Sequence, residues 1–251
     1  MTAHTLLTKI YNSHQLKQMT DILTDLVEGL DAQVAITGTF VNKWVTLDVS
    51  GEDEGVVLKL LERDIGFCPV RLENVKKFAS LKGYVTNLEK SKDTLLVDVG
   101  IAQPSTVNAS IPLTYLQANL AGGKKLPLKK ISELWGLCEN LPLNIKVLTV
   151  NTNDGIVEAE LQDSQLRKFG LWKDSLLDRL LVTGASPTEL NSAIDQAGIR
   201  RDVIDIESLG TFEHALVCKL GTDAAGLIGG IGRKLRKAKF TVFNPKKLLE
   251  A

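Results

Sequence analysis

Hydrophobic and polar positions in residues 1–70 predict a small α+β unit. Apolar residues recur every three or four positions from Leu16 to Leu30, which is the spacing of an amphipathic helix. Shorter apolar runs on either side have the length expected of strands. The expected elements are a strand at 5–11, a helix capped by Ser13, a hairpin of 32–40 with 44–49, and a helix at 56–65. Their order is that of most of a split βαβ layer, in which one sheet packs against two helices.

Residues 71–163 alternate in the way expected of a small barrel. Five short runs with alternating apolar residues predict strands, and two runs between the third and the fourth predict helices. The expected strands are 82–88, 94–101, 109–113, 143–150 and 156–161, and the expected helices are 113–120 and 128–137. In such a barrel, the side chains that point inward fill the interior.

The last part of the chain predicts a linker helix and a further α+β domain. Residues 164–186 place leucine and aromatic residues on one helical face, and a packing role is favoured there. A helix-turn-helix over residues 177–194 is disfavoured, because its second helix has no Lys or Arg for a base or a phosphate. The expected elements of the final domain are a helix from Pro187 to Gly198 behind a Ser186 cap, strands at 202–209 and 212–220, short helices at 222–228 and 233–237, and a strand at 239–244.

Composition and charge exclude several classes of protein. The 30 Lys and Arg balance the 30 Asp and Glu, so net charge alone points to neither nucleic acid nor membrane. The charges are nevertheless zoned, since residues 71–130 lean basic and residues 233–247 carry no acidic residue. The N-terminus does not resemble a signal peptide, and no apolar run has the length of a membrane span. The three cysteines, isolated and in apolar surroundings, favour a reducing compartment, so a cytoplasmic protein without a membrane partner is expected.

A glycine-rich turn followed by basic residues is the most specific motif in the chain. The segment reads Gly-Leu-Ile-Gly-Gly-Ile-Gly over residues 226–232, and Lys or Arg crowds the positions after it. Glycines let a backbone approach a ligand closely, and amides at a following helix start can face an anion. Together with the element order around it, the motif resembles the GxxG loop of type II KH domains, which clamps nucleotides by their backbone. The resemblance implies RNA contacts from Gly229, Gly230, Ile231, Gly232, Arg233, Lys234 and Lys237.

The same turn has an alternative interpretation. Gly230 and Ile231 carry no charge, whereas KH loops that bind RNA usually have a basic residue at one of these two positions. An apolar Ile231 at a loop tip would instead dock a partner protein, as in KH-like domains that serve as scaffolds. A protein-interaction scaffold is therefore the alternative to RNA binding.

A second pattern lies in the middle of the chain. A Gly-x-Val strand leads to a Val-Asp-x-Gly strand, then to a short strand, a helical connection and two final strands. The residues that match this pattern are Gly83, Val85, Val97, Asp98 and Gly100. The pattern resembles an S1-type OB barrel. The resemblance implies base stacking on a surface aromatic, for which Tyr84 is best placed. Lys124 and Lys125 would join the basic face, with a solvated connector as the alternative.

Catalytic constellations are weak in this sequence. His4, His14 and His214 have no Ser, Cys or carboxylate partner at motif spacing. The acidic Gly-Glu-Asp-Glu-Gly cluster at 51–55 lacks EF-hand spacing, and the Gly-Thr-Asp-Ala-Ala-Gly segment at 221–226 lacks the ending of a P-loop. No catalytic residue, metal or cofactor is therefore expected, and the chain is predicted not to be an enzyme.

These patterns together predict an α+β chain with several domains. The expected parts are a split βαβ-like unit at 1–70, an OB/S1-like β-barrel at 71–163, a linker helix at 164–186 and a type II KH-like domain at 187–251. The GYV…VDVG and GTDAAGLI…G blocks make the chain similar to an uncharacterised archaeal protein family without an assigned activity. The pairing of OB/S1-like and KH-like domains implies a non-enzymatic protein of RNA processing or of the ribosome, with RNA, including ribosomal RNA, as its partner.

Overall fold

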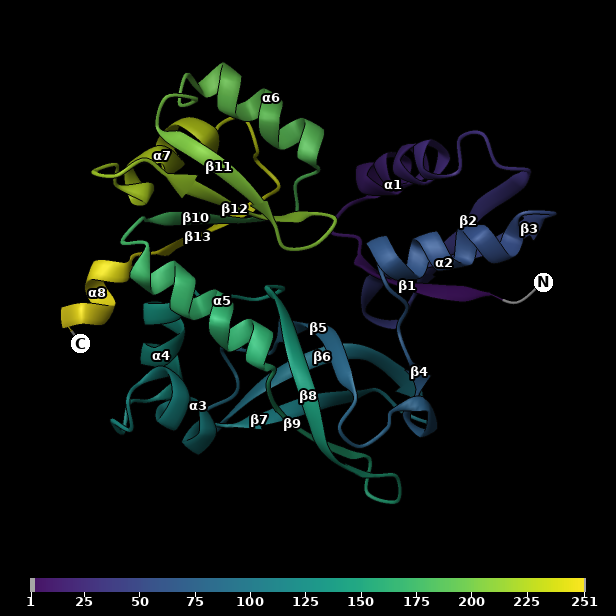
Figure 1. Cartoon of the computed structure of the whole chain (residues 1–251), viewed down its shortest axis with the longest axis horizontal. Helices are drawn as coiled ribbons and strands as arrows, with labels where there is room; N and C mark the ends of the chain where they lie inside the picture. The colour runs from purple at the N-terminus through teal and green to yellow at the C-terminus, as the bar shows by residue number, and fades with distance from the viewer. Residues whose placement is uncertain (1–2, 251) are drawn as a thin grey trace. The chain divides into compact units, whose positions relative to one another are not determined.

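The computed structural model describes residues 3–250, which form two compact units (Figure 1). The first unit holds the residues up to 74 together with residues 100–106, and the second holds residues 75–99 and the chain from 107 onward. No helix between residues 3 and 250 is both long enough and apolar enough to cross a lipid bilayer.

The first unit is a split βαβ layer, as predicted. Its elements are β1 (His4–Lys9), α1 (Ser13–Leu26), β2 (Ala32–Phe40), the 3-10 turn η1 (Val41–Lys43), β3 (Trp44–Gly51), α2 (Glu54–Asp64), β4 (Val70–Arg71) and the 3-10 turn η2 (Leu72–Asn74). The sheet has the antiparallel order β1-β3-β2, so β3 lies between the two strands that α1 connects. The cap of α1 is Asn12 rather than Ser13, because Asn12 and Gln15 satisfy each other's backbone donors in a capping box.

The second unit begins with a closed five-stranded barrel. Its elements are β5 (Ser80–Thr86), β6 (Thr94–Gln103), β7 (Val107–Pro112), α3 (Leu113–Leu120), α4 (Leu128–Trp135), β8 (Pro142–Asn151) and β9 (Ile156–Leu161). The strand order is β6-β5-β8-β9-β7, and a β6–β7 pairing closes it. β7 and β9 are parallel, whereas β5 is antiparallel to β6 and β8. This Greek-key barrel, with helices between the third and fourth strands, confirms the predicted OB fold.

The predicted linker helix over residues 164–186 is wrong in its second half. α5 (Asp163–Asp174) ends near Leu176, whose φ of 55° is left-handed, and β10 (Arg179–Thr183) follows. All five residues of β10 are buried. A short apolar run that is buried on both faces has no alternation, so its spacing does not distinguish a strand from a helix.

The C-terminal domain has the order β-α-β-β-α-β. Its elements after β10 are α6 (Pro187–Ala197), β11 (Val203–Ser208), β12 (Glu213–Cys218), α7 (Ala224–Ile231), β13 (Lys239–Phe243) and α8 (Pro245–Glu250). The sheet order β11-β12-β10-β13 is antiparallel throughout and interleaves two split βαβ units, which is the ferredoxin-like arrangement. The predicted series α6, β11, β12, α7 and β13 is present. Two features differ from the type II KH order: β10 precedes the series, and residues 232–238, between α7 and β13, form turns instead of the predicted second helix.

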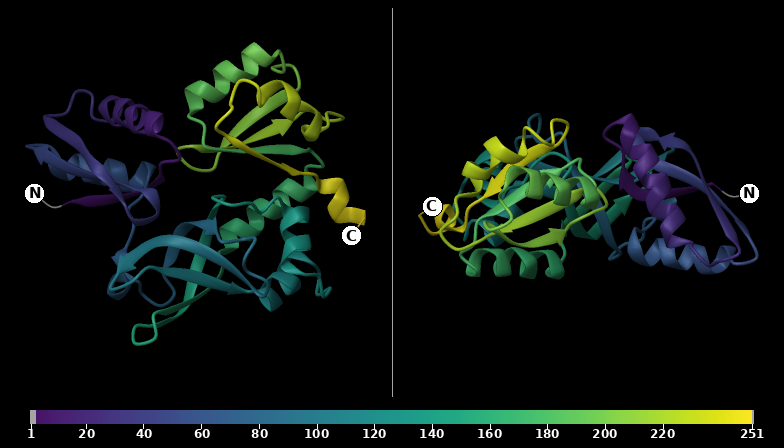
Figure 2. Two further views of the ribbon diagram at one scale, coloured as in Figure 1. Left: turned by 180° about the vertical axis from the view of Figure 1, so that it is seen from behind. Right: turned by 90° about the horizontal axis from the view of Figure 1, so that it is seen from above.

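Different helices pack against the two faces of the C-terminal sheet. α6 and α7 lie on the face away from the barrel (Figure 2, left), over a core that contains Leu180, Leu190 and Ile231. On the other face, α5 lies between the sheet and the barrel helices (Figure 1), and aromatic rings pack there. The aromatic cluster consists of Trp135, Phe169, Trp172 and Phe243, with ring centroids 5.3–6.2 Å apart. The two central strands, β10 and β12, are therefore buried throughout, and bases cannot stack on them.

Candidate nucleic-acid interface

The GxxG segment lies in a helix and not in a loop between two helices. α7 continues through Gly229 and Gly230, and Gly232 ends it with helical dihedral angles (φ −63°, ψ −29°). The reason is the spacing of the apolar residues that α7 buries in the domain core: Ala224, Leu227 and Ile231. Burial of this face stabilises a continuous helix, although glycine has a poor helix propensity.

Three backbone amides around Gly232 are already occupied by carbonyls of α7. The amide of Gly232 donates to the carbonyl of Ile228 (2.8 Å), and the amides of Lys234 and Leu235 donate to the carbonyl of Ile231 (2.9 and 3.0 Å). This is also the C-terminal end of a helix, where the dipole favours cations over anions. The predicted turn between two helices is therefore wrong, because the glycines end a helix and do not precede one. RNA contact by Gly229, Gly230, Ile231 and Gly232 stays a prediction.

The basic residues after α7 remain available through their side chains. The basic segment, residues 233–239, carries Arg233, Lys234, Arg236, Lys237 and Lys239, all of which are exposed. Arg233 Nε donates to the carbonyl of Gly229 (3.0 Å), and Leu235 anchors the segment in the core. Contact between this segment and RNA stays a prediction. The Lys and Arg side chains, and not the backbone amides, would make it.

Ile231 does not lie at a loop tip. Its side chain is 0% exposed and belongs to the core of the C-terminal domain. A partner protein cannot reach it without unfolding α7, so the scaffold alternative cannot use this residue.

We expect Gly229→Ala to raise stability and to leave RNA affinity unchanged. Gly229 is exposed within α7, and a Cβ built there meets no atom within 4 Å. Replacing a helical glycine with alanine stabilises a protein by roughly 0.5–1 kcal/mol when no clash results. Thermal unfolding and an RNA titration of the same variant check both parts. Loss of RNA binding in a stabilised variant would restore the backbone clamp.

Tyr84 is not a stacking platform. It is 0% exposed, and its hydroxyl donates to Glu213 Oε2 of β12 at 3.2 Å. Tyr84 does lie on the outer side of the barrel strand β5, paired with Asp98, but the C-terminal domain covers it. Sequence alternation identifies outward positions, and it does not show which of them a neighbouring domain buries.

The structure presents a different aromatic, Phe78, to solvent. Of the Phe, Trp and Tyr residues between 3 and 250, it alone is in the exposed class, at 61%. Its ring has two ammonium groups near it: Lys77 Nζ lies 4.9 Å from the ring centroid and Lys146 Nζ lies 5.9 Å away. An exposed aromatic ring flanked by cations is the arrangement by which single-stranded nucleic acids are bound.

The backbone holds Phe78 in this exposed position. Its φ is 65°, in the left-handed region that residues other than glycine seldom adopt. Two hydrogen bonds fix the turn to β8: the Phe78 amide donates to the Val147 carbonyl (2.8 Å), and the Val147 amide donates to the Ala79 carbonyl (2.9 Å). Such strain persists where the surrounding structure enforces it, and it clusters at functional sites. The sequence signal that could have indicated Phe78 is its position directly after Lys76 and Lys77.

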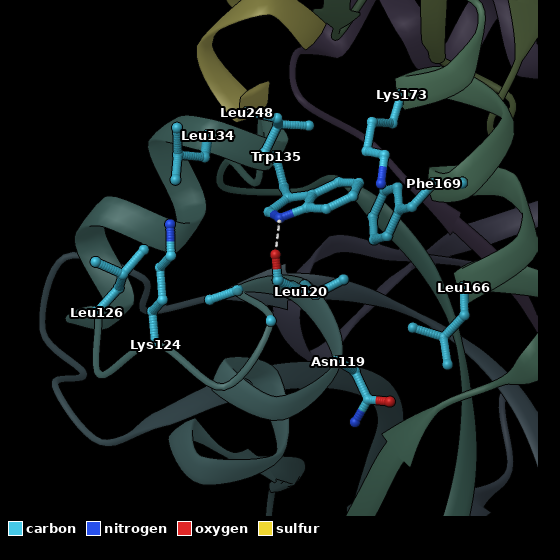
Figure 3. Close-up of a pocket in the computed structure, with 13 residues that line it drawn as sticks. Asn119, Leu120, Lys124, Leu126, Leu134, Trp135, Leu166, Phe169, Lys173 and Leu248 are labelled. Carbon is cyan, nitrogen blue, oxygen red and sulfur yellow. Dashed lines mark hydrogen bonds between the residues drawn. The ribbon is translucent and has the colours of Figure 1, made fainter. Parts of the chain in front are cut away.

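Lys124 lines a cavity of about 450 Å³ between the α3–α4 connection, α5 and α8 (Figure 3). The cavity wall is mostly apolar and includes Trp135, whose Nε1 donates to the Leu120 carbonyl at 2.9 Å. Lys173 lines the same cavity. Lys125 is exposed and does not line it.

The Cys138 and Cys218 thiols and the His214 imidazole are not activated as nucleophiles or bases. Burial raises the pKa of the Cys138 and Cys218 thiols to about 11, so both stay protonated at neutral pH. Burial also lowers the pKa of His214, whose Nε2 lies 3.1 Å from the Ala185 carbonyl. Within residues 3–250, no three His, Cys, Asp or Glu side chains are grouped so that they could hold a metal ion.

Family models match nearly the whole chain. The model described as the DUF2110 N-terminal domain matches residues 4–68, the DUF2110 central domain matches residues 75–173, and the DUF2110 C-terminal domain matches residues 177–243. The last match includes β10, in agreement with the place of this strand in the C-terminal sheet.

Comparisons with individual proteins and solved structures do not point to an activity. No curated protein matches the chain. One similar solved structure is the a/eIF2alpha-aDim2p-rRNA complex from Pyrococcus horikoshii OT3, with 14% sequence identity and a TM-score of 0.27. The match covers 49% of this chain and 64% of that chain, so this chain spans less than two thirds of its length. At that TM-score the likeness is too slight to transfer a fold or a function.

Proposed function

The chain belongs to the DUF2110 family, whose domain descriptions name no activity, and we propose that it is a non-enzymatic protein that binds single-stranded RNA. The observation that carries the proposal is the exposed Phe78 ring between Lys77 and Lys146 on an OB barrel. RNA of the ribosome or of RNA processing is the substrate class that fits an OB barrel joined to a domain with an exposed basic segment.

Phe78 supplies the stacking surface in this proposal. A base stacks on the exposed face of the ring, and the strained turn keeps the ring from collapsing onto the barrel. Stacking of one base on an aromatic side chain contributes about 1–3 kcal/mol, and it tolerates any base because every base has a π-face.

Lysine and arginine side chains supply the phosphate contacts. Lys77 and Lys146 adjoin the ring, and Lys146 also pairs with Glu160 (3.4 Å). Lys77 is therefore the better placed of the two to contact a phosphate next to the stacked base. The basic segment 233–239 adds further cations in the C-terminal domain. For single strands, each neutralised phosphate contributes about −0.7 to the slope of log affinity against log salt concentration.

Phe78→Ala is expected to weaken RNA binding by roughly 5- to 150-fold, which is the loss of about 1–3 kcal/mol of stacking. The measurement is fluorescence anisotropy at low salt, with a labelled single-stranded RNA of about twelve nucleotides, within the usual range of site sizes for OB folds. Lys77→Ala should reduce the salt slope by about 0.7 while keeping the stacking energy.

Two control variants separate stacking from general damage. Phe78→Tyr keeps an aromatic ring and should bind RNA as the wild type does. Leu171→Ala removes another exposed apolar side chain, 71% exposed on α5, and should change nothing. An affinity of Phe78→Ala equal to that of the wild type would refute the stacking role. DNA of the same sequence tests the preference for RNA, and a protein partner recovered after nuclease treatment would favour the scaffold alternative.

A further inference from the structure

Five charged side chains converge inside the second unit, where β5 and α5 meet the outer face of the C-terminal sheet. This junction cluster consists of Lys82, Lys168, Arg179, Glu207 and Glu213. Lys82 lies on β5, Lys168 on α5, and the other three lie on strands β10, β11 and β12. The cluster thus joins the barrel to the C-terminal domain.

The two carboxylates of the cluster already have strong partners. Glu207 accepts from Arg179 Nε (3.1 Å) through one oxygen and from Trp172 Nε1 (2.8 Å) through the other. Glu213 Oε2 accepts from the hydroxyl of Tyr84 at 3.2 Å. Arg179 also donates to the oxygens of Ser175 and Leu177, so its guanidinium is held in place.

The two lysines of the cluster have no such partner. Within residues 3–250, neither Lys82 nor Lys168 has a carboxylate oxygen within 4.0 Å, although both side chains are half-buried. The ammonium of Lys168 lies 5.4 Å from the centroid of the Trp172 ring. Burial lowers the pKa of both lysines. Glu213 opposes this effect on Lys82, and Glu207 opposes it on Lys168. Repulsion from Lys82 and Arg179 lowers the pKa of Lys168 further. A half-buried ammonium without an anion is costly, because burial disfavours the charged form.

Three cations of the cluster face two carboxylates, each of which already accepts a hydrogen bond from another side chain. Asp98, which lies on β6 opposite Tyr84, is a further buried carboxylate beside the cluster, and in the described part of the chain no ion pair joins it to Lys82 or Lys168. We propose that Lys82 and Lys168 together bind one phosphate group of the RNA backbone. A phosphodiester carries a single negative charge and accepts charge-assisted hydrogen bonds from ammonium groups, so it satisfies both lysines.

The position of Lys82 relates this phosphate site to the stacking platform. Phe78 lies two residues before the start of β5, and Lys82 is the third residue of that strand. Four residues of extended chain span at most roughly 13 Å, which is the length of about four stacked nucleotides. The site therefore gives bound RNA a direction, from Phe78 along β5 towards the C-terminal domain. That the phosphate belongs to RNA rests on the proposed function. That the site binds phosphate at all rests only on Lys82 and Lys168.

The test uses the full chain and two probes. The first probe is inorganic phosphate, compared with sodium chloride of equal ionic strength, and the readout is the midpoint of thermal unfolding. The second is the single-stranded RNA used for Phe78. The variants are Lys82→Met and Lys168→Met, which remove the charge and shorten the unbranched side chain by one atom. The matched control is Lys173→Met, at an exposed lysine of the same helix α5.

Phosphate should raise the unfolding midpoint of the wild type and of Lys173→Met. In Lys82→Met and Lys168→Met, the midpoint without phosphate should be higher than in the wild type, and the response to phosphate should be lost. RNA affinity should fall by at least about tenfold in both variants. Titration of Lys168 followed by NMR should show a higher pKa when phosphate is present.

The outcomes distinguish this inference from the proposed function. A phosphate response that survives in both lysine variants would overturn the phosphate site, whatever RNA does. Normal RNA binding by both variants would overturn the RNA assignment of the site. A phosphate response that depends on both lysines, with no RNA binding by the wild type, would sink the proposed function and identify free phosphate as the ligand.

Discussion

Ile231→Ala should lower the free energy of unfolding of the second unit by about 3–4 kcal/mol, within the range measured for buried isoleucine and leucine truncations. Ile231 is fully buried among the apolar side chains of α6, α7 and the C-terminal sheet. Removal of three carbons leaves a cavity that the neighbouring Leu190 and Ile194 cannot fill without leaving their own packing positions. Chemical denaturation followed by tryptophan fluorescence measures the loss.

Two further variants test the reason for this loss. Ile231→Val removes a single methylene group and should cost about 1 kcal/mol. Leu220→Ala truncates a side chain that is 73% exposed, and it should change stability by less than about 0.5 kcal/mol. If Ile231 instead docks a partner at the surface, Ile231→Ala will resemble Leu220→Ala in stability and will lose a protein partner.

Gly83→Ala should destabilise the barrel by about 3 kcal/mol, at the upper end of the cost of overpacking a core. A Cβ at this position would lie 2.7 Å from the Asp98 carbonyl oxygen and 2.7 Å from a methyl of both Val97 and Val99. These contacts are far inside van der Waals distance, and the carbonyl belongs to the paired strand β6. β5 can move away only by breaking its hydrogen bonds to β6 or β8. The clash therefore cannot be relieved without the loss of backbone hydrogen bonds. Thermal unfolding of the variant checks the prediction.

The matched control for Gly83→Ala is Gly170→Ala in α5. A Cβ there meets no atom within 4 Å, and alanine is the better helix former. The control should therefore gain roughly 0.5–1 kcal/mol. Equal stability of the two variants would show that Gly83 is not required by close packing and that its place in the S1-like pattern has another cause.

Local patterns predicted most of the elements because each pattern has a local physical cause. In the N-terminal unit, the helical spacing around Met19 and Leu23 identified α1, since those residues bury one face of it. The α6 cap was identified for the same kind of reason: Ser186 and Glu189 satisfy each other's backbone amides, and Gly198 ends the helix with a φ of 69°. Strand alternation likewise placed the five strands of the barrel.

The errors fall where a distant part of the chain decides the outcome. The sequence predicts a helix at β10 because the residues of this strand are buried on both faces by elements far away in the sequence. It predicts a surface position for Tyr84 because Glu213, which covers the ring, lies 129 residues further along the chain. It predicts a loop at the GxxG motif because glycine favours turns, whereas the burial of Ala224, Leu227 and Ile231 in the domain core stabilises a helix there.

The sequence by itself determined the α+β class, the barrel and the basic character of the segment after α7, since these follow from periodicity, turn chemistry and charge in neighbouring residues. Only the tertiary structure decided which aromatic is available to a base and which lysines lack a counter-ion. Exposure and ion pairing depend on how α5 and the C-terminal sheet cover the barrel, and such contacts join residues that no local pattern connects. For this reason the stacking role moved from Tyr84 to Phe78.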